Sequence, residues 1–525
     1  MWRVARKVRM RLTALITLSG RVEGLEEALK GLVEKANSEV FLKGVPEGLE
    51  EEAARIVSWR LENSRVRLEM VSGSRVRAPS ALLRFRKLLA ENLGRNLRIG
   101  VRKLEVPSLT MEISEVKLSP PALERIRGLE YVREAEVEGS LLRLETTPLG
   151  DSELKRNAAD RLLNLALKVA EEEVKPKVER EVHPVVLQGP AKPVRFREDP
   201  ARVAVELGWV KEFPGRGQWI YTPPYTRLLE ALEAILVEEI PEKLGFQPFM
   251  LPKLIPLEVM RKMPGYLEDI PEGMYYVCPP PRDPEAFSRF KEQLKITGMV
   301  KRELLREALK EPDYVLAPAQ CEPFWQLFSH ETLRLEDLPY KFYDRSGWTY
   351  RWEGGGVEGL VRVQEFRRIE LTYFGSPEQV VEIRDQVRDA AIRVADKILD
   401  LEWRVVAALP FYLRGGEVGD ISESRNVAAY DLEIYLPYRG ERETAEWLEV
   451  AGCFVHRDKF VRSFSIREAK NRPLWTGCTG LGVTRWVAAF LATHGFNPED
   501  WPKPVKERYR KAEVPRSLQW PKSQP

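Results

Sequence analysis

The chain has 525 residues, which is too long for one ordinary domain and suggests two to four units. It contains neither a run of eighteen apolar residues nor a basic-then-apolar leader, and its four cysteines are too few for a disulfide framework. These features argue against a membrane protein or a disulfide-stapled secreted domain and favour a cytoplasmic enzyme. The net charge is only +3, so a polyanionic partner has to be inferred from where basic residues cluster.

Short strand and helix patterns alternate over the first 149 residues. Period-two hydrophobicity predicts strands at 12–18 and 65–71, and helical periodicity predicts helices at 22–35 and 80–93. The pattern indicates an α+β module.

A basic cluster lies between residues 75 and 103 of this module, where acidic residues are few. On an otherwise balanced chain, such a cluster fits binding to a nucleic-acid backbone, through shape more than base identity. A solvated basic face is the alternative reading. The candidate tRNA-binding residues are Arg75, Arg77, Arg84, Lys87 and Arg102.

Residues 152–174 have the apolar spacing of a long connecting helix. Ser152 is the expected cap, and the apolar face is formed by Leu162, Leu165, Ala166 and Val169. Five prolines then fall between residues 176 and 200, which argues against a helix or a central strand. We therefore expect an N-terminal domain at 1–175, a linker at 176–207 and a second domain at 208–525. Charged residues with helical spacing predict a helical insertion at about 284–310.

Three stretches of the second domain have the residue types of a nucleotide site. The first is an amphipathic helix from Leu228 that ends near Pro241 and leads into a strand ending at Pro252. Read alone, this stretch is an ordinary core element.

The second stretch is a predicted hairpin with a glycine-rich turn. Residues two apart in a strand share a face, so Arg351 and Glu353 are expected on one face. The return strand would present a matching row: Arg362, Gln364, Phe366, Arg368 and Glu370. Two guanidiniums can clamp a phosphate and an aromatic ring can stack on a purine. A solvated, salt-bridged hairpin is the alternative.

The third stretch, residues 475–485, is rich in glycine and enters a predicted helix with Arg485 at its start. Glycines let the backbone approach a ligand closely, and a helix N-terminus favours an anion. A tight strand-to-helix turn is the alternative reading.

In this order, the three stretches resemble the three signature motifs of class II aminoacyl-tRNA synthetases. The resemblance implies a catalytic domain with an antiparallel sheet flanked by helices, and an α+β fold overall. It places Arg351 on the α-phosphate of ATP, Arg362 on the γ-phosphate, Phe366 under the adenine and Arg485 over its other face. The remaining implied ATP-binding residues are Glu353, Val363 and Glu449, with Glu449 matching the acid that holds ATP and Mg²⁺. The implied catalytic set is Arg351, Glu353 and Arg485.

Cys321, Glu370 and Cys478 could converge in such a core. Two thiolates and a carboxylate form a three-ligand zinc set with a fourth position left open. Small buried cysteines are the alternative. With the fold, the set resembles the atypical archaeal, methanogenic-type seryl-tRNA synthetases, whose zinc binds the serine amino group. The implied serine-binding residues are Ala319, Arg351 and Glu370, and Gly415 to Arg425 is similar to a loop that orders when serine binds. Gly452 and Phe454 depart from the small polar residues expected to face serine.

The resemblance implies a serine–tRNA ligase that forms seryl-adenylate and transfers serine to serine tRNA, with selenocysteine tRNA as a second acceptor. It further implies one Zn²⁺ per subunit, Mg²⁺ with ATP, a homodimer, no membrane partner and an N-terminal domain that grips the variable arm of the tRNA. The alternatives are an amino acid:carrier-protein ligase, which lacks that domain, and a non-catalytic RNA-binding paralogue. A paralogue would be expected to have lost Arg351, Glu353 or Arg485, and all three are present.

Overall fold

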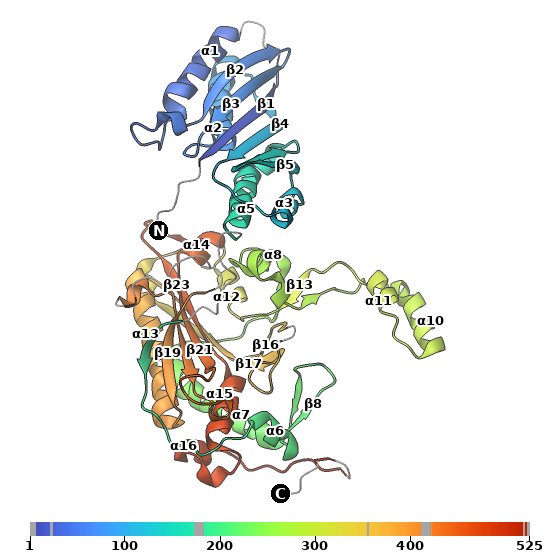
Figure 1. The fold of residues 1–525 in the computed structure, drawn as a ribbon, viewed down its shortest axis with the longest axis vertical. Helices are drawn as coiled ribbons and strands as arrows, with labels where there is room; N and C mark the ends of the chain where they lie inside the picture. Colours follow the sequence, from blue (N-terminus) through green and yellow to red (C-terminus); the bar gives the residue numbers. More distant parts are fainter. Residues whose placement is uncertain are drawn as a thin grey trace. The chain divides into compact units, whose positions relative to one another are not determined.

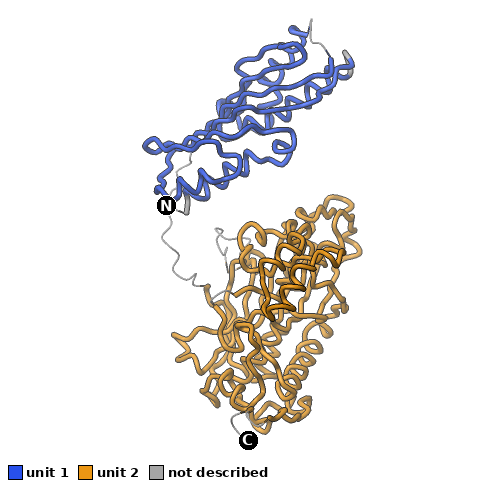
Figure 2. The backbone as a smooth tube through the Cα atoms, turned by 90° about the vertical axis from the view of Figure 1, so that its right-hand side faces the viewer, with its two compact units in different colours: residues 1–181 blue, residues 182–525 orange. Residues whose placement is uncertain are grey.

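The computed structural model describes residues 7–20, 25–172, 183–353, 356–410, 421, 423–517 and 520–521, without the side chains of 95–97 and 171–172. The chain divides into two units, Met1–Glu181 and Val182–Pro525, each coloured separately in Figure 2. Among the described residues, no helix is both long enough and apolar enough to cross a membrane.

A six-stranded antiparallel sheet forms the first unit (Figure 1). Its order is β2 (Arg55–Glu62), β3 (Arg65–Ser72), β1 (Val8–Leu18), β4 (Val101–Ile113), β6 (Leu141–Thr146) and β5 (Val132–Glu138). The strands predicted at 12–18 and 65–71 are confirmed as parts of β1 and β3.

The two faces of this sheet differ in exposure. Along β1, Leu12, Ala14 and Ile16 are fully buried in a core shared with α1 (Glu26–Lys35) and α2 (Ala78–Leu97). Arg9 and Arg11 alternate with the buried residues and are exposed, as is Arg67 of β3. One face is therefore covered by helices, and the other presents charged side chains to solvent, including these three arginines and the acidic Glu69.

The helix predicted at 152–174 is confirmed over residues 158–172, but its continuity and its Ser152 cap are wrong. The segment forms two helices, α4 (Asp151–Lys155) and α5 (Ala158–Glu172), separated at Asn157, which has φ of +56°. Asparagine tolerates this left-handed conformation, which no helix can continue. Ser152 lies inside α4, whose N-cap is Gly150. Within α5, Leu162, Ala166 and Val169 are buried in the core of the first unit, with α3 (Pro120–Arg127) nearby, whereas Leu165 is 38% exposed. The apolar face therefore completes the N-terminal core.

An eight-stranded mixed sheet forms the second unit. Its order is β10 (Gln247–Phe249), β15 (Tyr340–Asp344), β18 (Ile369–Gly375), β23 (Trp475–Leu481), β21 (Leu448–Arg457), β20 (Ala429–Ile434), β19 (Trp403–Ala408) and β7 (Val185–Gln188). β10 and β15 are parallel, and all the other pairs are antiparallel. The α+β class is confirmed, with one parallel pair that the expected antiparallel sheet did not include.

Helices cover one face of this sheet. α7 (Pro223–Val237), α13 (Pro377–Arg393) and α15 (Val483–His494) share a core with Ala451, Cys453 and Val455 of β21. Because neighbouring residues of a strand point to opposite faces, Gly452, Phe454 and His456 face the other side. That side is free to form a site.

A smaller, aromatic-rich cluster lies on the side of Gly452 and Phe454. Phe324, Trp325, Phe460 and Phe464 are buried in it together with Cys321 and Cys478. Its short elements are β11 (Leu254–Pro256), β12 (Tyr276–Val277), β13 (Tyr314–Leu316), α8 (Leu257–Met260), α9 (Tyr266–Asp269), α12 (Glu322–Leu327) and α14 (Lys459–Ser463). This cluster forms an apolar wall beside the open sheet face.

Three further segments complete the second unit. Residues 176–207, expected to be a linker, contribute the edge strand β7 and the helix α6 (Pro200–Glu206). The charged segment at 284–310 contains α10 (Ser288–Thr297) and α11 (Arg302–Ala308), with Gly298 in a left-handed conformation between them. Near the C-terminus, α16 (Lys503–Arg508) packs against α7.

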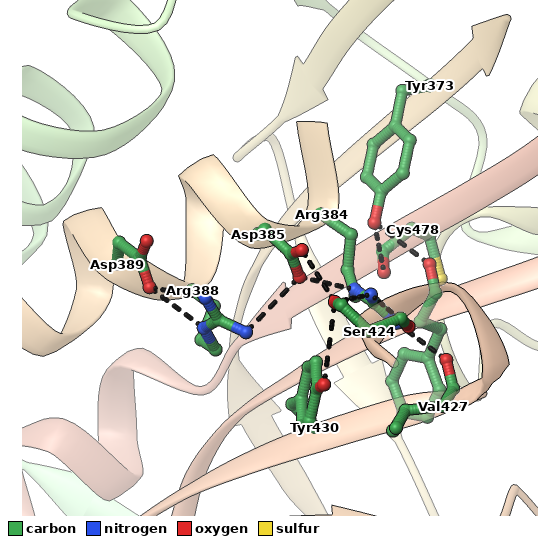
Figure 3. A network of polar contacts seen from close by, with 10 residues as sticks. Tyr373, Arg384, Asp385, Arg388, Asp389, Ser424, Val427, Tyr430 and Cys478 are labelled. Atoms are coloured by element: carbon green, nitrogen blue, oxygen red, sulfur yellow. Dashed lines mark hydrogen bonds and ion pairs between the residues drawn. The ribbon is translucent and has the colours of Figure 1, made fainter. Parts of the chain in front are cut away.

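A buried arginine on α13 fixes the beginning of β20 (Figure 3). The Arg384 guanidinium is fully buried and donates to the carbonyl of Val427 at 2.6 Å and to that of Ser424 at 2.8 Å. It also pairs with Asp385 at 2.9 Å and lies over the ring of Tyr430. Most of the loop Gly415 to Arg425 lies outside the described residues, but its C-terminal end is held by this network.

Replacing Arg384 with methionine is expected to destabilise the second unit by roughly 1–3 kcal/mol, because the buried carbonyl of Val427 and the partly buried carbonyl of Ser424 lose their donors. Arg388→Met is the control, since its partners Asp385 and Asp389 keep access to water and the loss should be about 1 kcal/mol or less. Urea unfolding followed by tryptophan fluorescence reports mainly on this unit, because only Trp2 and Trp59 lie outside it. Equal midpoints for the two variants would contradict the assigned role.

Candidate active site

Cys321, Glu370 and Cys478 come together on the open face of the second sheet. One ligand atom from each residue lies within 4.8 Å of the other two, and all three residues are buried. Cys321 caps α12, while Glu370 and Cys478 lie on the neighbouring strands β18 and β23. Glu370 pairs in register with Gly480, two residues from Cys478, so the two side chains share a face. The fold therefore brings together residues that are distant in sequence.

The chemistry of this trio fits a divalent metal. Glu370 accepts from Nε of Arg368 at 2.7 Å, but within the described part of the chain its Oε1 is buried without a hydrogen-bond partner. Burial raises the pKa of Glu370 to about 7, and contact with Cys321 together with burial raises the pKa of Cys478. Two sulfurs and one carboxylate oxygen are a donor set that suits zinc, which binds the deprotonated groups. The residues present therefore fit a zinc ion.

A cavity of about 230 Å³ borders the trio. Cys321 and Cys478 line one part of it, together with Ala319. Predicted nucleotide-binding residues line the cavity as well, namely Arg351, Phe366, Glu449 and Arg485. Nη1 of Arg485 lies 3.2 Å from Oε2 of Glu449, so this arginine is held beside the acid predicted to bind ATP. One cavity thus joins the two cysteines, Ala319 and these predicted nucleotide residues, whereas Glu370 is not among the residues that line it.

The return strand of the hairpin is shorter than predicted, so the predicted row of side chains does not include Arg362. β16 (Trp348–Tyr350) pairs with β17 (Glu365–Arg367), and Arg362 lies before β17 in a tight turn in which its N–H donates to the carbonyl of Glu358. This turn takes Arg362 off the strand face that carries Phe366. Arg362 is exposed and lines a second hollow of about 290 Å³, which Glu449 and Arg485 also border.

Glu353 and Val363 are not among the residues that line the 230 Å³ cavity. The N–H of Glu353 donates to Oε1 of Gln364 at 3.0 Å, which fixes the backbone after the Arg351 position. Val363 is buried, with 5% of its surface exposed. Arg351 itself is anchored by its N–H, which donates to the carbonyl of Gln364 at 2.9 Å.

His456 also lines the cavity, although no sequence motif marks it. Its Nε2 lies 3.4 Å from Sγ of Cys478, and its Nδ1 lies 3.1 Å from Oγ1 of Thr476. Burial lowers the pKa of His456 to about 3, so the ring is neutral at physiological pH. The signal that could have found it is the two-residue period of β21, which puts it on the same face as Gly452 and Phe454.

Asp431 was also missed. It lines the cavity from β20, directly opposite Gly452 in register. Burial and the neighbouring carboxylates of Glu449 and Glu433 raise the pKa of Asp431, while Arg485 opposes that shift. No local motif surrounds this residue, so its position becomes visible only in the folded sheet.

The basic residues predicted to bind tRNA differ in their exposure and in the contacts that they make within the first unit. In the first unit, Arg77 forms an ion pair of 2.7 Å with Asp160, and Arg84 donates to the carbonyls of Val40 and Lys43. Lys87 is 80% exposed with Glu91 at 4.0 Å, and Arg75 and Arg102 are exposed. Arg77 and Arg84 therefore contribute to internal structure as well.

Comparison with protein families assigns a class to each unit. Residues 8–168 match a family described as a tRNA-binding domain. Residues 305–494 match the tRNA synthetase class II core domain (G, H, P, S and T). The two matches lie in different structural units.

Relatives of known activity match nearly the whole chain. The type-2 serine–tRNA ligase of Methanocaldococcus jannaschii is 46% identical, with 95% of this chain and 96% of that protein covered. The type-2 serine–tRNA ligase of Methanothermobacter thermautotrophicus is 43% identical, with 98% and 100% covered. The crystal structure of M. kandleri SerRS in complex with A. aeolicus tRNASec has a TM-score of 0.76 and 41% identity, with 98% and 100% covered. The chain therefore belongs to the type-2, methanogenic-type seryl-tRNA synthetases and is a class II serine–tRNA ligase.

Proposed function

We propose that Cys321, Glu370 and Cys478 hold a Zn²⁺ ion that positions serine by its amino group beside ATP. The observation that supports this proposal is the convergence of the three ligand atoms within 4.8 Å at the border of the cavity. When bound, zinc would supply one open coordination position for a neutral amine and would act as a template. Ala319 and Arg351 line the same cavity and would contact the rest of the amino acid.

The chain's own residues would then promote adenylate formation by positioning and charge stabilisation. The serine carboxylate attacks the α-phosphorus of ATP, the bond to the β-phosphate oxygen breaks, and pyrophosphate leaves. Arg351 is proposed to hold the α-phosphate, Phe366 and Arg485 the adenine, and Glu449 the Mg²⁺ that accompanies ATP. Glu353 would order the entrance beside the adenine, with Val363 supporting the turn behind it. No protein nucleophile is needed for this step.

The second hollow is lined by arginines and by carboxylates, and we propose that it takes the remaining phosphates. Arg362 borders it together with Arg439 and Arg485, and Nη2 of Arg362 lies 3.7 Å from Glu446. We propose that Arg362 exchanges this exposed ion pair for the γ-phosphate when ATP binds, because exposed pairs contribute little stability. In the transfer step, the terminal ribose hydroxyl of tRNA attacks the acyl carbon and AMP leaves.

The test is ATP–pyrophosphate exchange with each standard amino acid and the purified full-length chain. Serine is expected to support exchange, and removal of zinc by a chelator should abolish it until zinc is restored. Exchange that survives with no bound zinc would refute the metal assignment. Exchange that requires zinc but is fastest with another amino acid would refute the serine subsite alone.

We propose that the first unit binds the backbone of the tRNA, and that the domain boundary lies near residue 175. Arg75, Lys87 and Arg102 are exposed, and the open sheet face adds Arg9, Arg11 and Arg67. The related M. kandleri SerRS was crystallised with tRNASec, which supports selenocysteine tRNA as a second acceptor beside serine tRNA. A homodimer is proposed from the class II core.

The double change Lys87→Ala and Arg102→Ala is expected to weaken tRNA binding and leave serine-dependent exchange unchanged. Each lost phosphate contact should reduce the slope of log affinity against log salt concentration by about 1. Lys503→Ala is the matched control, because this lysine is 83% exposed on α16 of the second unit. Filter binding at several salt concentrations measures the slope. An unchanged slope, or an equal fall in exchange, would contradict the separate role of the first unit.

A further inference from the structure

Two glycines leave a gap in the floor of the cavity. Asp431, Gly452, Gly480 and Glu370 are register partners on four adjacent strands, and strands are about 4.8 Å apart. The two carboxylates therefore stand at the ends of a row whose middle has no side chains. Both ends of this row carry carboxylates. The side chains that lie over the two glycines therefore determine the shape of the cavity.

Each glycine is covered closely by a neighbouring side chain. A Cβ at Gly480 would collide with the guanidinium of Arg368, which is paired with Glu370. A Cβ at Gly452 would lie 2.8 Å from Cε2 and 2.9 Å from Cζ of Phe454, and 3.2 Å from Oδ1 of Asp431. The Phe454 ring therefore lies directly on Gly452, in a space that exists because position 452 has no side chain.

Phe454 also adjoins the proposed metal ligands. It is the register partner of Cys478, and it lines the cavity together with Cys321 and Ala319. Part of its side chain packs against the aromatic-rich cluster. The cluster behind it and the backbone of Gly452 beneath it leave the ring little room to retreat, so it forms a firm wall.

We propose that Phe454, seated on Gly452, determines the size of the amino-acid side chain that the site accepts and so excludes threonine and larger residues. The inference rests on the proposed binding of the amino group at Cys321, Glu370 and Cys478. An amino acid held there has its side chain close to Cys478. Of the two register partners of Cys478, Thr372 and Phe454, Phe454 is the one that lines the cavity. Discrimination against one added methylene in an apolar pocket is roughly 10- to 200-fold. A pocket reaches this degree of discrimination only if the side chain that forms its wall cannot move aside.

The first test is Phe454→Ala in the full-length protein, with kcat/KM for exchange measured for serine and threonine. The threonine-to-serine ratio is expected to rise by roughly 10- to 200-fold, because the added methyl group gains room. Phe342→Ala is the matched control: it removes an aromatic ring that packs on the same cluster without lining the cavity. Phe454→Leu, which preserves an apolar side chain, should shift the ratio in the same direction by a smaller factor. An unchanged ratio in a folded Phe454 variant would overturn the proposal.

The second test is Gly452→Ala, alone and combined with Phe454→Ala. The new methyl group should push the ring toward the substrate and raise KM for serine, whereas the double variant should recover because the ring is gone. If the single and double variants are equally impaired, the ring on Gly452 does not shape the pocket. Wild-type exchange with serine and its dependence on zinc are measured alongside. Failure there would refute the proposed function, whereas normal wild-type exchange with an unchanged ratio would refute the role of Phe454 alone.

Discussion

Replacing Cys321 with alanine is expected to reduce serine-dependent ATP–pyrophosphate exchange by more than about 100-fold. Changes to groups that merely orient metal ligands already cost roughly 10- to 100-fold, and this change removes one of three proposed ligands. The variant should also lose zinc, measured by elemental analysis of the purified protein. Added serine should not compensate, because the binding position for its amino group would be absent.

Cys453→Ala is the matched control for this prediction. Cys453 is as deeply buried as Cys321, but it faces the helical core on the opposite side of β21, where burial raises its pKa to about 12. Its thiol therefore faces away from the cavity and lies outside the group of proposed ligands. The control should retain both zinc and exchange. Loss of exchange in both variants would point to impaired folding, and full exchange in Cys321→Ala without zinc would refute the metal site.

Replacing Arg351 with alanine is expected to lower kcat for exchange by roughly 100- to 1,000-fold. Preorganised donors that face developing charge contribute effects of this size. Arg351 lines the cavity with Phe366 and Cys321, and its backbone N–H donates to the carbonyl of Gln364, which anchors the backbone at this position. Steady-state exchange at saturating serine and ATP measures kcat, and titration of each substrate measures KM.

Arg351→Lys separates charge from geometry. Lysine keeps the positive charge but loses the planar, two-pronged donor set of arginine, so it should recover a minor part of the activity. The control is Arg393→Ala on α13, which removes an arginine paired with Glu239 on the helical side of the sheet. If Arg351→Ala raises KM for ATP and leaves kcat unchanged, the residue binds the ground state and does not stabilise the transition state.

The grouping of the proposed nucleotide-binding residues was largely predictable from sequence, because these residues lie in short motifs. Arg351, Phe366 and Arg485 each follow a local pattern of glycine, strand and helix, and all three line one cavity. Arg362 shows the limit of this reasoning. Two-residue alternation assumes a continuous strand, and the Glu358–Arg362 turn shortens that strand. A tight turn within a predicted strand leaves little trace in a single sequence.

The proposed metal ligands could be predicted only with the help of a family resemblance. Cys321, Glu370 and Cys478 are far apart along the chain, and no local spacing marks them as a set. Their proximity depends on strand order, since β18 and β23 are neighbours in the sheet. His456 and Asp431 were missed for the same reason. The helix at 152–174 was misjudged because its apolar face could equally complete a domain core or bridge two domains.

The alternation along β21 also links folding to chemistry. Cys453 belongs to the helical core and Phe454 to the cavity, although they are consecutive residues. Deleting one residue between Glu449 and Cys453 would shift the register and turn every later side chain of the strand to the opposite face. A thiol would then enter the cavity, while Phe454 and His456 would be forced among the helices. An error in strand pairing would therefore disrupt the active site and the hydrophobic core together. A chain with a misplaced active site would also lack the core that keeps it folded.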